Sequence, residues 1–556
     1  MKTIAVLACV LPAGCYHGLG AGPDGDVGVG SDGAASDGAQ TAAGSDTGDG
    51  DGDGDDDDAC AAAAPDALRR LTGSQYARSV TALTGIELSA ALLGLLAPVE
   101  PPLDAFENLA DTLLVRQSDA EAYQRIAESV ARERFSGDDA TIAAWVGCAS
   151  SEPTCLEDFI ERFTRLAYRR PVTATERANL RALADAAIDA GGLGPWAPWS
   201  TVVEAVLQSP KFVLVVEPSS EIADERLPLD DHQIATRLAL ALWDQIPDAD
   251  LLDHADAGAF TDRTERLGII AQMLDDPRAE TAVRQFASRW FRVDAIDGAD
   301  FVEATNGEAA ALRADAKAEV LSLLDAHVVQ GDLRELYTSQ HAAITPALAA
   351  IYGVTPDEEV EFAPDDHRGG LFGTAGFLAM TSSGTHASPV QRGVFVRRVS
   401  LCSEPPPPPP GVPMDDATSD EHSANPACWG CHVALDPIGW GLDRYGPSGS
   451  LRTAAPDGRP LHESGYFDEA ADLEFADAAQ LGAAVLAHPS FVGCAAENAM
   501  KWFYAKVPRA AETCVAEAST PAFIAAEFNM RTLVRELVGD DAITRRVMPA
   551  AIEGGG

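Results

Sequence analysis

The chain has 556 residues, of which 46% are hydrophobic, and a formal net charge of −46. This length is enough for several hydrophobic cores, organised as about three to five domains. The strong negative charge argues against nucleic acid and anionic lipid surfaces as partners, because proteins bind these by neutralising phosphates with clustered Lys and Arg.

Residues 1–15 have the pattern of an export signal. Lys2 precedes an apolar run from Thr3 to Gly14, and the run ends at Cys15. It is shorter than the roughly 20 apolar residues that a membrane-spanning helix needs, so it predicts a signal peptide. The pattern resembles a bacterial lipoprotein signal, which implies a lipid anchor at Cys15; an ordinary secretory signal is the alternative. Both predict export, to the periplasm or to the outer membrane and cell surface.

Residues 16–64 consist mainly of Gly, Ala, Ser and Asp. They contain too little apolar surface to offset the entropy lost on folding. We therefore predict a disordered acidic tether between the anchor and the folded part.

The rest of the chain shows helical periodicity almost throughout. Tyr76, Val80 and Leu83 form one apolar stripe, and the helix is expected to end near Gly85. A longer apolar face runs through residues 156–166, and Pro171 is expected to end that helix.

Two further patterns strengthen the helical prediction. Thr173 and Glu176 have the spacing of a capping box. Ile234, Leu238 and Leu242 repeat at every fourth position before Pro247. Because clean two-residue alternation is rare, we predict a mostly α, multi-domain helical protein. The expected folded segments are 65–145, 146–218, 219–355, 356–462 (a cytochrome c-like domain) and 463–556.

The cysteines are expected to form disulfides in an exported chain. Apart from Cys9, Cys15 and one Cys-x-x-Cys pair, six remain, and six allow fifteen pairings. Cys148 with Cys155 is the best local candidate, because the two close a short loop before a helix. The remaining expected pairs are Cys494 with Cys514 and, by elimination, Cys60 with Cys402.

The Cys-x-x-Cys pair is followed directly by a histidine: Cys428, Cys431 and His432. A zinc site needs a fourth ligand, and the usual second Cys or His pair is missing nearby. A thioredoxin-like dithiol follows a strand in a βαβ unit, whereas Pro413 and Pro426 favour irregular chain here. A plain disulfide needs no histidine. Cys-x-x-Cys-His is the attachment pattern of c-type haem, in which two thiols one helical turn apart bind the vinyl groups and the imidazole binds iron.

At these residues the sequence resembles a planctomycete cytochrome C domain, a family also abundant in myxobacteria. The shared pattern comprises Cys428, Cys431, His432, Asp436, Pro437, Gly439, Tyr445, Gly449 and Arg452. Upstream, 388–393 (SPVQRG) and 405–413 (PPPPPPGVP) also fit. Segments in the rest of the folded chain are similar to companion domains of unknown function. The chain departs from the pattern at Leu435, where the family often has Met.

The resemblance implies one covalent haem c with His432 as axial ligand. His422, where the family commonly carries a histidine, is a candidate second ligand; Met380, Met414 and His386 are weaker ones. Arg392, Arg444 and Arg452 are candidates for pairing with haem propionates, with a surface ion pair as the alternative for each.

The predicted function is single-electron transfer at the cell envelope, with electron-transfer protein partners that the sequence does not identify. A haem enzyme of peroxidase or oxidase type, with an open iron position, is the first alternative. A binding scaffold in which the haem is structural is the second.

Overall fold

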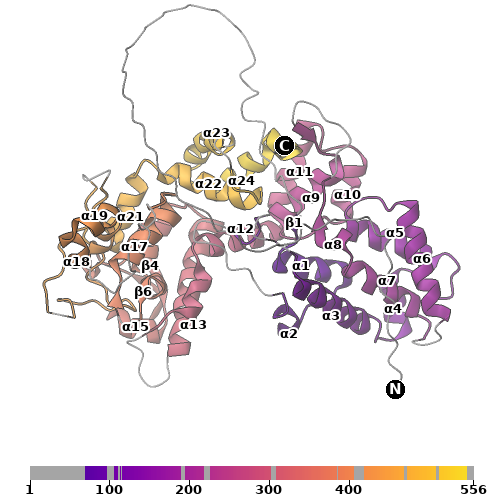
Figure 1. Cartoon of the computed structure of the whole chain (residues 1–556), viewed down its shortest axis with the longest axis horizontal. Coiled ribbons are helices and arrows are strands. Elements are labelled where there is room, and N and C mark those ends of the chain that lie inside the picture. Colours follow the sequence, from indigo (N-terminus) through magenta and orange to yellow (C-terminus); the bar gives the residue numbers. More distant parts are fainter. Residues whose placement is uncertain are drawn as a thin grey trace, which may run out of the picture. The chain divides into compact units, whose positions relative to one another are not determined.

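A computed structural model gives the fold of the chain (Figure 1). It describes residues 69–96, 106–109, 113, 115–189, 194–217, 226–301, 309–384, 386–405, 419–456, 458–468, 473–508 and 513–547. The predicted signal peptide, Cys15, the tether and Cys60 lie outside these residues, as do Pro413 and Met414.

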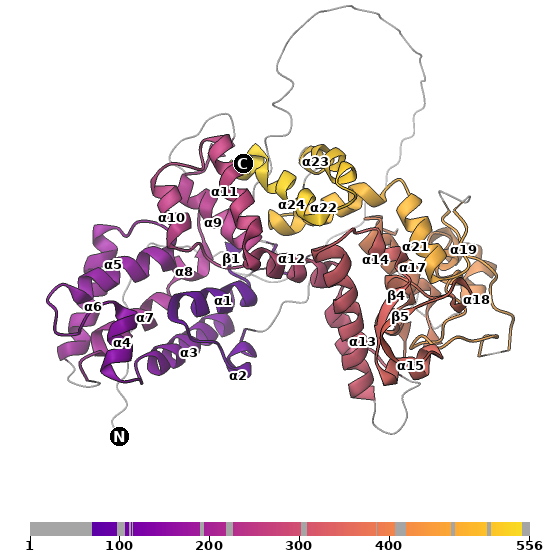
Figure 2. The ribbon, with the colours of Figure 1, turned by 180° about the vertical axis from the view of Figure 1, so that it is seen from behind.

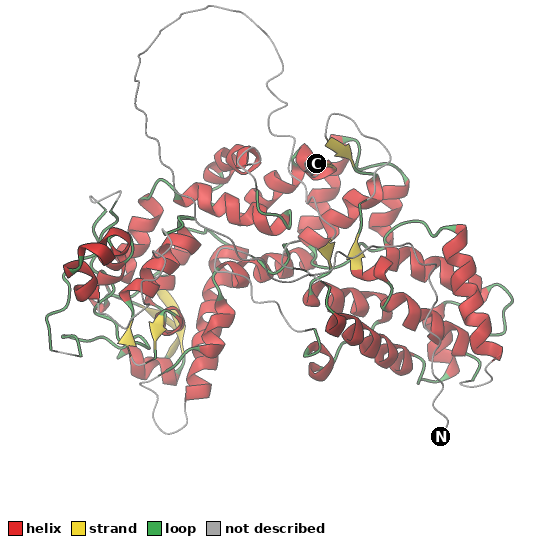
Figure 3. Cartoon of the chain, in the orientation of Figure 1, coloured by secondary structure: helices red, strands yellow, loops and turns green. Residues whose placement is uncertain are grey.

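Helices dominate the described residues, and the strands are short (Figure 3). The predicted mostly α fold is therefore confirmed. The described strands form four two-stranded antiparallel sheets: β1 with β2, β3 with β8, β4 with β5, and β6 with β7. Within the described residues, no single helix has the length and apolarity to cross a membrane. Among the described helices, only α21 (Ala478–Ala487) and α22 (Phe491–Phe503) taken together reach that length and composition, and they meet at an angle of 85°.

The N-terminal helices surround one hydrophobic core, to which Tyr76, Phe159 and Val203 contribute buried side chains. The predicted helix at Tyr76 begins after a capping box of Thr72 and Gln75 and ends at Gly85, which adopts the left-handed conformation. The elements of this part are β1 (Arg69–Arg70), α1 (Gly73–Thr84), α2 (Ala90–Leu93), α3 (Gln117–Arg134), α4 (Asp139–Val146), α5 (Cys155–Tyr168), α6 (Ala174–Asp189), α7 (Ala197–Leu207), α8 (Pro210–Val213) and β2 (Leu214–Val215).

The other helix predictions in this part are also confirmed. α5 buries one apolar face and ends before Pro171. Thr173 and Glu176 form the predicted capping box: the Glu176 amide donates to the Thr173 hydroxyl at 3.2 Å, and the Thr173 amide donates to the Glu176 carboxylate at 2.9 Å. The disulfide Cys148–Cys155 is present as predicted and closes the loop before α5.

A second hydrophobic core is formed by the elements that follow. Strands β4 and β5 lie beside helix α13 (Figure 2). The first elements are β3 (Arg226–Pro228), α9 (Asp231–Leu242), α10 (Ala249–Asp256), α11 (Arg263–Asp275), α12 (Pro277–Trp290), the 3₁₀ helix η3 (Val293–Gly298), α13 (Ala309–Leu324), the π-helix η4 (Asp325–Val329), α14 (Glu335–Thr338), β4 (His341–Ile344), α15 (Pro346–Tyr352) and β5 (Asp357–Glu361).

The second core continues to the end of the described chain. Its remaining elements are η5 (Pro364–Asp366), η6 (Leu371–Gly373), α16 (Ala375–Met380), β6 (Ser382–Ser383), β7 (His386–Ala387), α17 (Pro389–Phe395), the π-helix η7 (Val396–Ser400), α18 (Ser419–Ala424), α19 (Pro426–His432), α20 (Asp436–Trp440), α21 (Ala478–Ala487), α22 (Phe491–Phe503), α23 (Thr513–Ala525), α24 (Met530–Gly539), η8 (Asp541–Thr544) and β8 (Arg545–Val547).

The two disulfides predicted for the rest of the chain, Cys494–Cys514 and Cys60–Cys402, are both wrong. Cys494 pairs with Cys402, with a Cα separation of 5.1 Å, and not with Cys514. The physical reason is that η7 packs on α22, which brings Cys402, just after η7, next to Cys494. The predicted Cys60–Cys402 pair is therefore also wrong. Cys514 is disulfide-bonded as well.

Candidate functional site

Helices α17 and α20 meet backbone to backbone in the cytochrome-like segment. A Cβ on Gly439 of α20 would lie 2.2 Å from the Cα of Pro389 in α17. A Cβ on Gly393 would lie equally close to the carbonyl oxygen of Leu435. Only glycine permits such an approach. The Ser-Pro-x-x-Arg-Gly and Asp-Pro-x-Gly motifs are thus the two sides of one helix contact, which fixes the start of α20 at Asp436.

The two candidate haem cysteines lie on helix α19. Cys428 and Cys431 are three residues apart, so both thiols lie on the same side of the helix. Both are partly buried, and they are the two described cysteines that form no disulfide. His432 is the last residue of the same helix. The structure therefore brings the two thiols and the imidazole into one short element.

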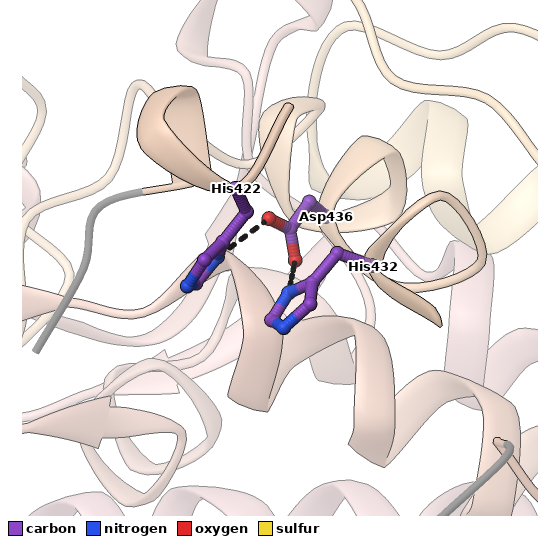
Figure 4. A group of neighbouring side chains, drawn as sticks. All are labelled: His422, His432 and Asp436. Carbon is purple, nitrogen blue, oxygen red and sulfur yellow. Dashed lines mark hydrogen bonds and ion pairs between the residues drawn. The ribbon is translucent and has the colours of Figure 1, made fainter. Parts of the chain in front are cut away.

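Asp436 joins the two candidate histidines (Figure 4). Its carboxylate oxygens bond separately to His432 Nδ1, at 3.0 Å, and to His422 Nδ1, at 3.2 Å. The Asp436 side chain is 0% exposed, whereas those of His422 and His432 are 10% and 23% exposed. The potential ligand atoms of these three residues lie within 4.8 Å of one another, which makes the trio a candidate metal-binding group.

The carboxylate determines which ring nitrogen each histidine can offer to a metal. Because a carboxylate accepts hydrogen bonds, each imidazole donates from Nδ1 and retains Nε2 as the possible ligand atom. Burial raises the pKa of the Asp436 carboxyl, and its bonds to His432 and His422 oppose that rise. Asp436 therefore acts as the orienting partner of two imidazoles.

The relative position of the two imidazoles bears on the sixth iron ligand. The ring centroids of His422 and His432 are 3.8 Å apart, with an interplanar angle of 33°. Axial ligands of one haem iron lie on opposite faces of the porphyrin, which requires the macrocycle between them. If His432 held an iron, His422 in its present position beside His432 would not be placed to bind the same iron from the opposite side.

An aromatic stack begins on the helix that carries the two thiols. Trp429, between the two cysteines in sequence, stacks on Trp440 with a centroid distance of 5.8 Å. Trp440 in turn stacks on His462 at 4.6 Å, with the rings only 8° from parallel. This Trp429–Trp440–His462 stack ties α19 to α20 and to the loop that carries His462.

Asp443 holds the far end of that stack. Its carboxylate is 1% exposed and accepts from Arg452 at 2.6 Å, from Arg459 at 2.7 Å and from His462 Nδ1 at 3.0 Å. Burial would raise the pKa of Asp443, but the hydrogen bonds from His462 and Arg459 outweigh burial and hold that pKa well below its usual range. The terminal Arg of the family pattern is therefore part of a buried ionic cluster.

Two of the candidate propionate partners, Arg392 and Arg452, bind other groups of the protein. Arg392 is buried and donates to the carbonyl oxygens of Leu442 at 2.7 Å and of Tyr445 at 3.3 Å. Arg452 binds Asp443. Arg392 and Arg452 thus stabilise the conformation of the chain around residues 442–446.

The weaker ligand candidates are dispersed. Met380 is half-buried against the second core, and His386 is exposed in β7. The roles of Asp436 as imidazole partner and of Asp443 with His462 as a cluster were not predicted from the sequence. The i,i+4 spacing of His432 and Asp436 was a readable signal for the first, whereas the second depends on a contact across 19 residues.

The residues present fit a covalent haem. Two free thiols on one side of a helix match the donor set that thioether attachment requires, and the adjacent imidazole has its Nδ1 held by a buried carboxylate. No element of the described site occupies the thiols with each other or with another cysteine.

Comparison with family models matched four domains, each described as a protein of unknown function. They are PSD3 (DUF1587) at residues 69–136, PSD5 (DUF1595) at 155–217, PSD4 (DUF1592) at 229–354 and PSCyt3 (DUF1588) at 368–455. Neither the comparison with curated proteins nor that with solved structures returned a match. The PSCyt3 match contains Cys428, Cys431, His432 and Asp436. The chain therefore belongs to the multi-domain proteins built from planctomycete cytochrome C and PSD domains.

Proposed function

We propose that this chain is a c-type cytochrome-like protein of the cell envelope, which binds one covalent haem and transfers single electrons to protein partners. The observation that carries the proposal is the combination, at the end of α19, of two free thiols with an imidazole held by a buried carboxylate. The match of residues 368–455 to a cytochrome-related domain agrees with it.

In this proposal Cys428 and Cys431 provide the thioether links and His432 the axial imidazole. Bound haem supplies a one-electron iron couple. The other residues act by position: Asp436 fixes the ring orientation of His432 and makes Nε2 more basic. The close contact of α17 and α20 keeps Asp436 in place.

The test is to mature the full chain in a host that attaches c-type haem, and to measure the pyridine haemochrome spectrum and the mass of the purified protein. We expect one haem per chain, and none in C428A/C431A. The matched control is C148A/C155A, which removes another cysteine pair and should retain the haem. A colourless wild-type protein whose Cys428 and Cys431 are joined to each other, or hold zinc, would overturn the proposal.

One observation favours a second function, a haem enzyme with an open iron position. His422 touches His432 and shares its carboxylate, instead of lying opposite to it. Ligand spectroscopy on the matured protein separates the two functions. A six-coordinate low-spin spectrum favours electron transfer, whereas a high-spin spectrum that responds to cyanide or peroxide favours catalysis. H422A should leave the spectrum unchanged if His422 is not a ligand.

The proposal includes export and lipid anchoring at Cys15. The support is the residue pattern at positions 1–15 alone. We expect wild-type protein in the membrane fraction and C15A in the soluble envelope fraction. Equal partition of both proteins would remove the anchor from the proposal and leave the haem site unaffected.

A further inference from the structure

A cavity of about 380 Å³ lies against one face of α13, and its lining includes none of the residues assigned to haem attachment. Its wall continues through the π-helix η4, strand β4 and the loop from Gly369 to Thr374. Leu323 and Phe362 are among its apolar lining residues, and its volume is in the range of small-molecule sites. All of its lining residues fall between 319 and 374.

Glu319 is the buried charged residue of this cavity, at 7% exposure. Its two carboxylate oxygens accept from the hydroxyl of Tyr352 at 2.7 and 2.9 Å. That hydroxyl also accepts the amide of Ala375 at 2.6 Å. Among the described residues Glu319 forms no ion pair. A buried carboxylate without a paired cation is costly, so a cation that entered the cavity would be bound favourably.

Arg368 is the protein cation that acts on Glu319, and its two terminal nitrogen atoms donate to other groups. Its Nη2 donates to the carbonyl of Gly449 at 2.6 Å, and its Nη1 donates to that of Gly373 at 3.3 Å. The guanidinium carbon lies 4.1 Å from the centre of the Tyr352 ring. Burial raises the pKa of Glu319 to about 7, against the opposing effects of the Tyr352 hydrogen bond and the Arg368 charge. Glu319 is thus close to the balance between neutral and charged forms at neutral pH.

The other titratable residues of the cavity wall are His327 on η4, Glu335 on α14 and His341 on β4. Among the described residues, no Lys or Arg lines the cavity. His327 lies on a π-helical turn, a local irregularity that is frequent at functional sites, and burial lowers its pKa. With neutral imidazoles the charge of the wall is therefore negative, because Glu319 and Glu335 are its two ionisable acids.

We infer that this cavity binds a small organic cation, in which a protonated amine pairs with the Glu319 carboxylate and an apolar body packs against Leu323 and Phe362. The inference rests on the cavity, on the buried carboxylate and on a lining in which the described residues include no Lys or Arg. It does not depend on the proposed haem.

The test uses calorimetric titration of the full-length protein with benzylamine, and with benzyl alcohol and benzoate as neutral and anionic analogues of similar shape. We expect benzylamine to bind more tightly than either analogue by about tenfold or more, because they cannot pair with a carboxylate. Glu319→Gln keeps an acceptor for the Tyr352 hydroxyl and should lose this preference. Glu133→Gln, an exposed change in α3, is the matched control and should bind like wild type.

The pH dependence gives a second measurement. Pairing with an ammonium requires ionised Glu319, so benzylamine affinity should rise by about tenfold from pH 6 to pH 8, and it should fall again at higher pH where the amine loses its own proton. Protonation of His327, whose pKa burial lowers, would weaken binding in the same direction at low pH. The pH dependence of benzylamine affinity that remains in Glu319→Gln measures the histidine contribution. The difference between this pH dependence and that of wild type measures the contribution of Glu319.

A third variant tests the cavity without changing Glu319, so that the conclusion does not depend on correct folding of Glu319→Gln. Ser322 is exposed at the cavity wall, so Ser322→Phe should block the cavity and abolish binding without disturbing the core. Equal binding of benzylamine and benzyl alcohol, tighter binding of benzoate, or unchanged affinity in both Glu319→Gln and Ser322→Phe would overturn the inference. The same titration on C428A/C431A should give the wild-type result, which keeps this outcome separate from that of the haem proposal.

Discussion

Gly439 lies directly against Pro389: a side-chain carbon at this glycine would stand 2.3 Å from the proline carbonyl oxygen. The contacting atoms of Pro389 belong to the backbone, which cannot move away by a rotamer change as a flexible side chain can. This contact sets the separation of α17 and α20, and through it the position of Asp436, the residue that holds both imidazoles.

Gly439→Ala is therefore expected to destabilise the protein by about 1–3 kcal/mol or more, the usual cost of overpacking, and to lower haem attachment. Gly430→Ala is the matched control, because Gly430 lies on the adjacent helix α19 and has no atom within 4 Å of an added Cβ. It should be neutral or slightly stabilising, since Ala favours helix over Gly. Denaturant unfolding measures the stability of both variants. Equal stability of Gly439→Ala and Gly430→Ala would contradict the close contact between Gly439 and Pro389.

Local patterns in this chain were readable from sequence, and long-range contacts were not. The stripe of Tyr76, Val80 and Leu83 predicts its helix because the neighbours that define it are within one or two turns. The pairing of Cys402 with Cys494 joins residues 92 positions apart and follows from packing of η7 on α22, which no local pattern records.

The candidate site divides in the same way. Cys428, Cys431 and His432 form a contiguous motif, and the structure places them on one helix. The convergence of His422 on Asp436 depends on how α18 packs next to α19. The Glu319 network needs Tyr352 and Ala375, from two later elements, and is visible only in three dimensions.

The Asp443 cluster should show a stability loss on substitution. Asp443→Asn removes the buried charge that Arg452 and Arg459 contact, at an expected cost of about 1–3 kcal/mol at pH 7. Because the folded pKa of Asp443 lies below its unfolded value, its contribution is complete above about pH 4 and is lost as the pH falls further. The difference between wild type and variant in denaturant unfolding should therefore shrink from pH 7 to pH 3. If the difference in unfolding free energy between wild type and Asp443→Asn stayed constant from pH 7 to pH 3, the stability loss would not come from the ionised Asp443 carboxylate.

The two described disulfides should contribute unequally. Cys402–Cys494 joins residues 92 apart, and Cys148–Cys155 joins residues 7 apart. In the chain-entropy description their removal costs about 4–5 and about 2 kcal/mol, respectively. C402A/C494A should therefore unfold at lower denaturant than C148A/C155A, with fluorescence and circular dichroism as probes. The reverse order would show that native contacts, and not loop length, dominate.

Asp244 offers a test of a buried carboxyl outside both proposed sites. Burial raises its pKa to about 6, against the opposing charge of Arg78, whose Nη1 lies 3.5 Å from its carboxylate. Its φ of 51° is left-handed, a conformation that Asn also tolerates. Asp244→Asn should therefore fold normally and remove the charge that burial disfavours.

The sign of the pH effect follows from the raised folded pKa. The folded state favours the neutral carboxyl, so the contribution of Asp244 to the free energy of unfolding is most favourable below about pH 4, becomes less favourable as Asp244 ionises, and levels off above about pH 6. Between pH 4 and pH 7 wild type should lose about 2–3 kcal/mol relative to Asp244→Asn. The exposed Asp300→Asn should track wild type at both values in the same denaturant titrations. A wild-type curve parallel to that of Asp244→Asn would mean that Arg78, with the hydrogen bonds from Ser74 and Gln75, compensates fully for the burial of this carboxylate.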